Sequence, residues 1–293
     1  MITVLEYATL SWHTYHPFFN LFGKTPQVFQ ITKDTTVDKT YSGWHQITDI
    51  SHHMHPAQDF YAQLYVKFAF GKPLAGVVAF RGTVITDWDN DKVDFNTWAS
   101  DVIAQGKNNQ IPKYFTQAEW FYHDSLRYLF DELKCHHLSV TGHSLGGAIA
   151  QLIPGLLQMP STAISFNSPG IGHIPGVEQA QASSIHAVNS TYGFINKIGK
   201  PLGHITYVDV PEKEPQAKQA LEDSAKEKNL SYQLEHTKDP TERANLYCAL
   251  NLENHLPDKI DFFESVGAQH SIGNLLKTLH EKKYGAVAGQ GFI

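Results

Sequence analysis

The chain has 293 residues, of which 42% are hydrophobic and 18% are charged, and its formal net charge at pH 7 is −6. This composition supplies enough apolar material for a large core. The acidic balance disfavours a nucleic-acid surface, which needs clustered Lys and Arg. A single domain spanning residues 1–293 is expected, because α/β enzymes commonly use this length for one domain.

The middle of the chain alternates short apolar runs with longer helical patterns. Leu74 to Phe80 (LAGVVAF) is predicted to be a buried strand, because the run is short, apolar and followed by Gly82. Residues 116–133 are predicted to be a helix, because apolar side chains recur there at helical spacing. This pattern predicts a strand followed by an amphipathic helix.

The same alternation continues after residue 133. A second strand is predicted from Leu138 (LSVTG), and a helix from Ala148 (AIAQLI) up to Pro154. Three further strands are predicted, at Thr162 to Asn167, Ile185 to Asn189 and Ile205 to Val210. Strands that alternate with helices favour an α/β fold with a mostly parallel central sheet and helices on both faces.

Two segments interrupt this alternation. Residues 211–260 are charged and helix-prone with little apolar periodicity, so we predict a helical insertion, or cap, at the edge of the sheet. Residues 84–97 are irregular and rich in Asp, and form the candidate lid. Trp88, Phe95 and the following Trp98 are candidate substrate-binding side chains that could meet a lipid surface.

A possible nucleophile lies between the second predicted strand and its helix. Gly142 to Gly146 (GHSLG) fits the pattern GxSxG, which has chemical meaning when a strand precedes it and a helix follows. Small residues at its two ends permit a sharp turn that exposes the hydroxyl of Ser144. We predict that Ser144 is the nucleophile of an acyl transfer and place His143 among the candidate substrate-binding residues.

A serine hydroxyl needs a base, which in this arrangement follows the nucleophile in the order Ser, acid, His. The chain has 17 histidines. We favour His270, because it lies after the last predicted strand, in a loop (GAQHS) before an apolar helical run. His255 and His280 are the alternatives.

Four stretches together resemble the class 3 lipase family, the fungal-lipase type of α/β hydrolase. They are FRGT at 80–83, TWASDV at 97–102, GHSLGGAIA at 142–150 and FNSPGIG at 166–172. The resemblance implies an α/β-hydrolase fold and lipid esters as substrates of a lipase, phospholipase A or lysophospholipase. It also implies an oxyanion hole formed by the backbone N–H of Leu145 and by the backbone N–H and hydroxyl of Thr83.

The chain departs from this family at the acid. The family places an Asp just after the strand that matches Ile185 to Asn189, but residues 190–196 (STYGFIN) contain no carboxylate. Asp209 is the next candidate, because it keeps the chain order and could orient the imidazole from the neighbouring strand. The alternatives are Asp258, Asp261 and Glu264, or an amide group of Asn189 or Asn196.

The leading interpretation is a serine ester hydrolase that acts on lipids through a Ser144 acyl-enzyme, without a cofactor or metal ion. The histidine-rich segment 51–55 lacks carboxylate or cysteine partners at metal-binding spacing. A carboxylesterase or acyltransferase for soluble esters is a second interpretation. A catalytically impaired lipase-fold scaffold is a third. The expected partner is a lipid or ester substrate, including a membrane or micelle surface.

The N-terminal sequence lacks a basic region followed by a continuous apolar run, which a cleavable signal peptide requires. No stretch of about 18 apolar residues is present, so we expect no membrane-spanning helix. The two cysteines, Cys135 and Cys248, predict no disulfide framework. We expect a cytoplasmic protein, or one exported as a secreted effector without a cleavable signal.

Overall fold

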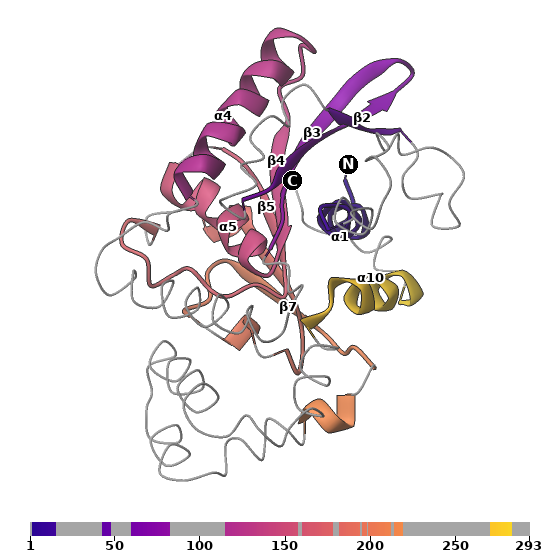
Figure 1. Ribbon diagram of the computed structural model, residues 1–293, viewed down its shortest axis with the longest axis vertical. Coiled ribbons are helices and arrows are strands. Elements are labelled where there is room, and N and C mark those ends of the chain that lie inside the picture. The colour runs from indigo at the N-terminus through magenta and orange to yellow at the C-terminus, as the bar shows by residue number, and fades with distance from the viewer. Residues whose placement is uncertain are drawn as a thin grey trace, which may run out of the picture.

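A seven-stranded sheet forms the centre of the computed structural model, and its strands follow one another in sequence order (Figure 1). The described residues are 2–15, 43–47, 60–82, 115–157, 160–177, 182–193, 195–197, 199–211, 214–218 and 270–282. The strands are β1 (Trp44–Ile47), β2 (Ala62–Ala69), β3 (Lys72–Phe80), β4 (Leu138–His143), β5 (Ala163–Phe166), β6 (Ile185–Ser190) and β7 (His204–Val208). The strands predicted from the sequence correspond to β3 to β7.

The sheet is mostly parallel, as predicted. β1, β2 and β3 pair in antiparallel fashion, whereas each pair from β3 to β7 is parallel. Parallel pairing brings the carboxyl ends of neighbouring strands to one edge, the edge at which α/β proteins bind their ligands. Phe80 is opposite Gly142, and His143 is opposite Phe166. The predicted motifs FRGT, GHSLG and FNSPG therefore begin at the same edge.

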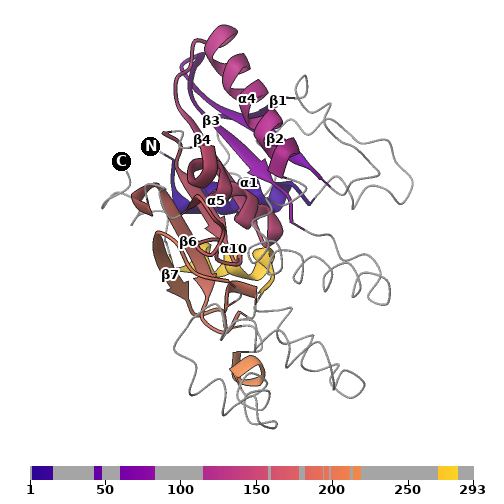
Figure 2. The same ribbon diagram turned by 90° about the vertical axis from the view of Figure 1, so that its left-hand side faces the viewer.

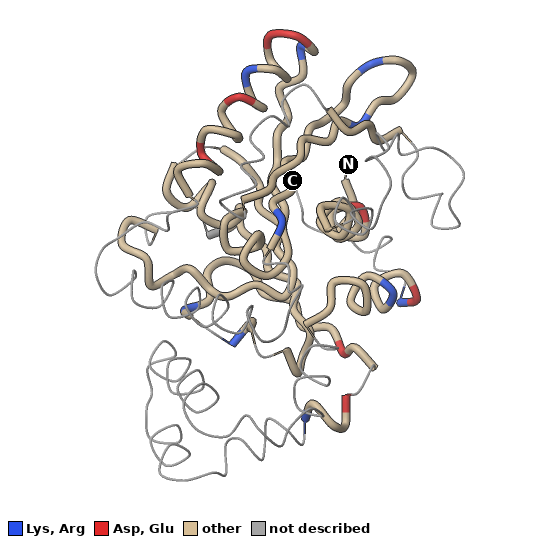
Figure 3. The backbone as a smooth tube through the Cα atoms, in the orientation of Figure 1, with Lys and Arg blue, Asp and Glu red and all other residues tan. Residues whose placement is uncertain are grey.

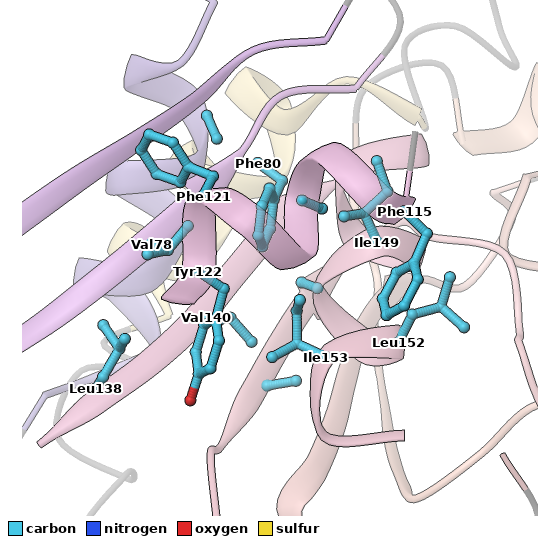
Figure 4. Packing of buried hydrophobic residues seen from close by; sticks show 14 of the residues in the cluster. Val78, Phe80, Phe115, Phe121, Tyr122, Leu138, Val140, Ile149, Leu152 and Ile153 are labelled. Atoms are coloured by element: carbon cyan, nitrogen blue, oxygen red, sulfur yellow. The ribbon is translucent and has the colours of Figure 1, made fainter. Parts of the chain in front are cut away.

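Helices cover both faces of the sheet (Figures 1 and 2). They are α1 (Val4–His13), α4 (Phe115–Asp131), α5 (Leu145–Leu157) and α10 (Ile272–Glu281). On one face, aromatic side chains of α4 and aliphatic side chains of α5 pack against β3 and β4 (Figure 4). Phe121, Phe80 and Ile153 are almost completely buried there.

Helices α1 and α10 contact each other on the opposite face. Leu10 of α1 and Leu275 of α10 belong to one buried cluster with Phe166 and Val208 of the sheet. Apolar burial of about 25 cal/mol per Å² makes these two clusters the main favourable contribution to folding. The second cluster also fixes the start of α10 near the end of β5.

The helix that follows Ser144 of the GxSxG motif is longer than the sequence predicted. α5 begins at Leu145 and continues through Pro154 to Leu157, whereas we predicted a helix from Ala148 to Pro154. An interior proline costs about 3 kcal/mol, because it removes one backbone hydrogen bond and its ring crowds the preceding turn. Almost every side chain of α5 is buried, so packing outweighs this local cost.

The N-terminal helix α1 was not among the predicted elements. It begins with a capping box in which Thr3 and Glu6 satisfy each other's backbone N–H groups. The buried Glu6 carboxylate also accepts hydrogen bonds from Trp44 Nε1, at 3.0 Å, and from Lys67 Nζ, at 2.5 Å. One carboxylate thus ties the start of α1 to β1 and β2.

Among the described residues, charged residues occur along α4, at the hairpin that joins β2 to β3, and at the end of α10 (Figure 3). In the part of the chain that the structure describes, no helix has the length and apolar character needed to cross a bilayer. The candidate lid 84–97 lies outside the described residues. Of the predicted insertion 211–260, the structure describes residue 211 and a helical turn at 214–218.

Candidate active site

Ser144 occupies a sharp turn between β4 and α5, with a φ of 56°. This left-handed backbone conformation is costly for a residue with a Cβ, and such strain gathers at functional sites. The backbone N–H of Ser144 donates to the Phe166 carbonyl oxygen at 3.0 Å, which anchors the turn to β5. The strand, sharp turn and helix predicted around GxSxG are all present.

The two glycines of GxSxG are required by close backbone contacts. A Cβ placed on Gly142 would lie 2.2 Å from the carbonyl oxygen of Gly146. A Cβ placed on Gly146 would lie 2.1 Å from the carbonyl oxygen of Phe80 at the end of β3. Both distances are far below van der Waals contact, so this turn can form only where neither residue has a side chain.

The exit of β3 lies directly against the nucleophile turn. A Cβ placed on Gly82 would be 2.5 Å from the His143 carbonyl oxygen and 2.9 Å from Ser144 Cβ. Thr83, the predicted oxyanion donor, follows immediately but lies outside the described residues. Leu145, the other predicted donor, is the first residue of α5, so its N–H has no acceptor within the helix.

His270 precedes Ser271, the N-cap of α10, and lies at the edge of the sheet that carries Ser144. Its ring lies 4.6 Å from the His143 ring, measured between centroids. Its main-chain carbonyl oxygen accepts hydrogen bonds from His143 Nε2, at 2.7 Å, and from Asn167 Nδ2, at 3.2 Å. The structure therefore brings His270 beside the residue that precedes Ser144. The alternative His280 lies exposed near the end of α10, and His255 lies outside the described residues.

Both histidines are kept neutral by their surroundings. Burial, followed by the neighbouring His143, lowers the pKa of His270 well below its usual 6.5. Burial also lowers the pKa of His143 to about 4, although the hydrogen bond to the His270 carbonyl acts in the opposite direction. A general base must be unprotonated to accept a proton, and the His270 imidazole is in that state near neutral pH.

The depressed pKa of His143 predicts that the fold loses stability in acid. Because the folded state binds this proton only near pH 4 and the unfolded chain near 6.5, unfolding is favoured as the pH falls between these values. The contribution is about 3 kcal/mol at 1.36 kcal/mol per pKa unit. Urea denaturation at several pH values should show a shallower loss of stability in His143→Gln than in the parent. Parallel curves would contradict this expectation.

Both ring nitrogens of His143, which we predicted to contact substrate, are engaged by the protein. Nδ1 lies 2.8 Å from the Tyr15 hydroxyl, and Nε2 lies against the carbonyl of His270. The His143 side chain is 6% exposed. This geometry favours a role for His143 in holding Tyr15 and the main chain of His270 rather than in contacting substrate. The predicted residues Trp88, Phe95 and Trp98 lie outside the described residues, as does the histidine-rich segment 51–55.

Asp209, the acid that we predicted, follows β7. Its carboxylate accepts a hydrogen bond from the Thr191 hydroxyl at 2.6 Å, and its main-chain carbonyl accepts one from Lys282 Nζ at 3.1 Å. Among the described residues, His270 Nδ1 is buried and has no hydrogen-bond partner. The alternative carboxylates Asp258, Asp261 and Glu264 lie outside these residues. The alternative amides Asn189 and Asn196 are buried and line a small cavity beside Gln151 of α5.

This geometry gives a direct test of Asp209. Because its carboxylate holds Thr191 rather than a histidine, Asp209→Asn should leave turnover within about threefold of the parent and preserve the fold. Initial rates of ester hydrolysis would measure the effect. A loss of several orders of magnitude would instead assign Asp209 to the catalytic triad, as its position in the sequence suggests.

Three hydrogen bonds align α1 with β4, the strand before Ser144. Tyr7 Oη donates to Ser139 Oγ at 2.8 Å, and Ser11 Oγ lies 2.9 Å from Thr141 Oγ1. Tyr15, just after the helix, makes the third with His143. Four helical residues advance about 6 Å and two strand residues about 6.6 Å, so the two spacings match. The polar side of α1 thus follows β4 to the edge of the sheet that carries Ser144.

Asn167, like Tyr15, was not singled out as a site residue by the sequence analysis. It has a φ of 44°, which asparagine adopts more readily than most residues. Its Oδ1 accepts hydrogen bonds from the backbone N–H of Ser190, at 2.6 Å, and from the Ser190 hydroxyl, at 3.0 Å. Its amide nitrogen donates to His270. Asn167 therefore links the ends of β5 and β6 to the segment that carries the candidate base.

A mostly parallel sheet covered on both faces, with a serine on a strained turn between a strand and a helix, is the arrangement of the α/β-hydrolase fold, as predicted. Residues 77–175 match the sequence model of the family described as "Lipase (class 3)". The resemblance to class 3 lipases is thereby confirmed over this segment, which runs from the end of β3 through α4, β4, α5 and β5.

Several solved structures are similar to this chain. A fungal lipase has 15% sequence identity and a TM-score of 0.44, over 71% of this chain and 78% of that chain. The Rhizomucor miehei lipase in a propeptide complex has 15% identity and a TM-score of 0.42, over 70% of this chain and 66% of that chain. The Rhizopus microsporus var. chinensis lipase has 14% identity and a TM-score of 0.37, over 70% and 73%. A search of curated proteins finds no match.

Proposed function

We propose that this chain is a serine ester hydrolase that acts on lipids, with Ser144 as nucleophile and His270 as general base. The observation that carries the proposal is the position of Ser144. It lies on a strained turn at the start of α5, and the adjacent His143 holds the main chain of His270 at the same edge of the sheet. The match of residues 77–175 to class 3 lipases supports lipid esters as the substrate class.

The proposed reaction has two steps. Ser144 Oγ attacks the ester carbonyl carbon while the His270 imidazole takes the hydroxyl proton. The negative charge on the former carbonyl oxygen is stabilised by Leu145 N–H and by the N–H and hydroxyl of Thr83, each worth about 3 kcal/mol. The intermediate then expels the alcohol, which receives the proton from His270. Water, activated by His270, hydrolyses the acyl-enzyme, releasing the fatty acid and restoring Ser144.

The imidazolium formed in each step needs an acceptor at Nδ1. That atom is buried and lacks a partner among the described residues, so it is the place where a triad acid would act. The carboxylate of Asp209 accepts a hydrogen bond from Thr191 instead, so we favour Asp258, Asp261 and Glu264 as candidates over Asp209. A serine hydrolase that lacks the acid keeps part of its rate, because the nucleophile, base and oxyanion donors remain.

A catalytically impaired scaffold is the second candidate function. It is favoured by one observation, the absence of a carboxylate at residues 190–196, where class 3 lipases place their acid. The strained backbone of Ser144 opposes it, because such a turn costs stability of the order of 1–3 kcal/mol and is of use only for presenting the hydroxyl.

The test is release of fatty acid from phosphatidylcholine vesicles and of alcohol from a short soluble ester, with Ser144→Ala as the matched blank. The proposal expects release from vesicles that disappears in the variant. Hydrolysis of the soluble ester alone would overturn the lipid assignment in favour of a carboxylesterase. Release at equal rates by parent and variant, or no release from either substrate, would overturn the serine-hydrolase assignment.

A further inference from the structure

We infer that Tyr15 is a positioning residue that holds the base segment and the oxyanion segment together around Ser144; this inference rests on the proposed function. Tyr15 lies just after α1, far from the nucleophile motif in sequence. Its hydroxyl contacts both His143 Nδ1, at 2.8 Å, and the backbone N–H of Gly82, at 3.0 Å. These two partners adjoin Ser144 and Thr83 respectively.

Hydrogen bonds link Gly82, Tyr15, His143 and His270 in series, and the groups at the two ends of this series determine which atom donates in each bond. The His270 carbonyl can only accept, so His143 Nε2 must carry the proton and donate. Because His143 is neutral, its Nδ1 is then an acceptor, and the Tyr15 hydroxyl donates to it. The oxygen of Tyr15 in turn accepts the N–H of Gly82. A continuous series of hydrogen bonds therefore runs from Gly82, just after β3, to the main-chain carbonyl of His270.

The position of Tyr15 is itself well determined. Its backbone N–H donates to the Trp12 carbonyl oxygen at 3.1 Å, and the Thr14 hydroxyl donates to the Ser11 carbonyl oxygen at 2.7 Å. A Cβ placed on Gly82 would lie 2.5 Å from the Tyr15 hydroxyl, so this contact depends on glycine at that position. The Tyr15 hydroxyl is thus the last of the three polar groups that join α1 and its C-terminal end to β4, and it lies beside Ser144's neighbour His143.

The consequence concerns rate rather than substrate affinity. Misplacement of catalytic groups by about 1 Å can cost about 100-fold in rate. Without the Tyr15 hydroxyl, His143 Nδ1 and the Gly82 N–H both lose a buried partner, while the edge-to-face packing of the two rings remains. The His143 ring can then rotate, and the His270 carbonyl loses the shorter of its two hydrogen bonds.

The experiment compares Tyr15→Phe with Tyr7→Phe. Both variants lose one buried tyrosine hydroxyl that bonds to β4 at 2.8 Å, but Tyr7 contacts Ser139, five residues before the nucleophile. Tyr15→Phe should lower kcat about 10- to 100-fold with little change in KM, and Tyr7→Phe should keep kcat within about twofold. Equal kcat values for the two variants would overturn the inference.

Backbone NMR supplies a readout that needs no turnover. In Tyr15→Phe the amide signals of Gly82 and His270 should shift or broaden, whereas in Tyr7→Phe they should stay in place. Unmoved signals in Tyr15→Phe would overturn the inference even if the parent proved inactive. Failure of the serine-hydrolase assignment would be seen separately, in the ester-hydrolysis assay. There the parent would release no product, or Ser144→Ala would release it as fast as the parent.

Discussion

His270→Ala is expected to lower ester turnover by about 10⁴- to 10⁶-fold while the protein remains folded. The substitution removes the imidazole that would take the Ser144 proton. It keeps the main-chain carbonyl to which His143 and Asn167 donate, so the segment before α10 should stay in place. Initial rates on the best substrate found for the parent would measure the loss.

The matched control is His280→Ala, in α10 itself. His280 is exposed, so its removal should leave both turnover and stability close to those of the parent. Near-normal turnover by His270→Ala would contradict the assignment of the base. A large loss in His280→Ala, with normal stability, would transfer the role to that residue.

Gly146→Ala should abolish both the fold of the nucleophile turn and the activity. The added methyl group would meet the carbonyl group of Phe80, which the backbone of β3 holds in the centre of the sheet. Overpacking of this kind typically costs about 1–3 kcal/mol, and more where only backbone can move. Thermal unfolding should show a large decrease in Tm, or no soluble protein should be obtained.

Gly273→Ala provides the control for this substitution. Gly273 lies in α10, and its nearest neighbours to an added Cβ are Ser271 Oγ at 3.5 Å and Trp12 Nε1 at 3.8 Å. Alanine there should raise stability by up to about 1 kcal/mol, because it favours the helix more than glycine does. A Gly146→Ala protein as stable and active as the parent would show that the turn does not need this close contact.

The sequence predicted the central fold well because parallel strands covered on both faces are continuous apolar runs. Leu74 to Phe80 is a run of this type. The strand from Leu138 is shorter and less apolar, but its place before GHSLG, with a helix after the motif, made the strand and the turn predictable. The helix was predicted to end at Pro154 because local propensity was weighed without the burial of α5 on nearly every side.

The parts of the site that the sequence did not predict depend on contacts between distant residues. Tyr15 and His143 are separated by 128 positions, and no local pattern records that they meet. Two signals were nevertheless present. The capping-box pattern of Thr3 and Glu6 marks the start of α1. Polar residues at alternate positions of the buried strand β4 indicate hydrogen-bond partners on one of its faces.

The acid illustrates the limit of chain order as evidence. Asp209 satisfies the order Ser, acid, His, but its side chain bonds to Thr191 across the ends of β6 and β7. The register between β6 and β7 decides which residue lies opposite Asp209, and the order of residues along the chain does not specify that register. Sequence order therefore limits the candidates to those between Ser144 and His270 without choosing among them.

The most direct test of the account is the site of covalent modification by a fluorophosphonate, which reacts with an activated serine whatever the natural substrate. Peptide mass spectrometry of the treated protein should find one adduct, on Ser144, and the rate of labelling should fall steeply in His270→Ala. An adduct on another residue, or labelling of Ser144 that does not depend on His270, would contradict the proposed nucleophile and base.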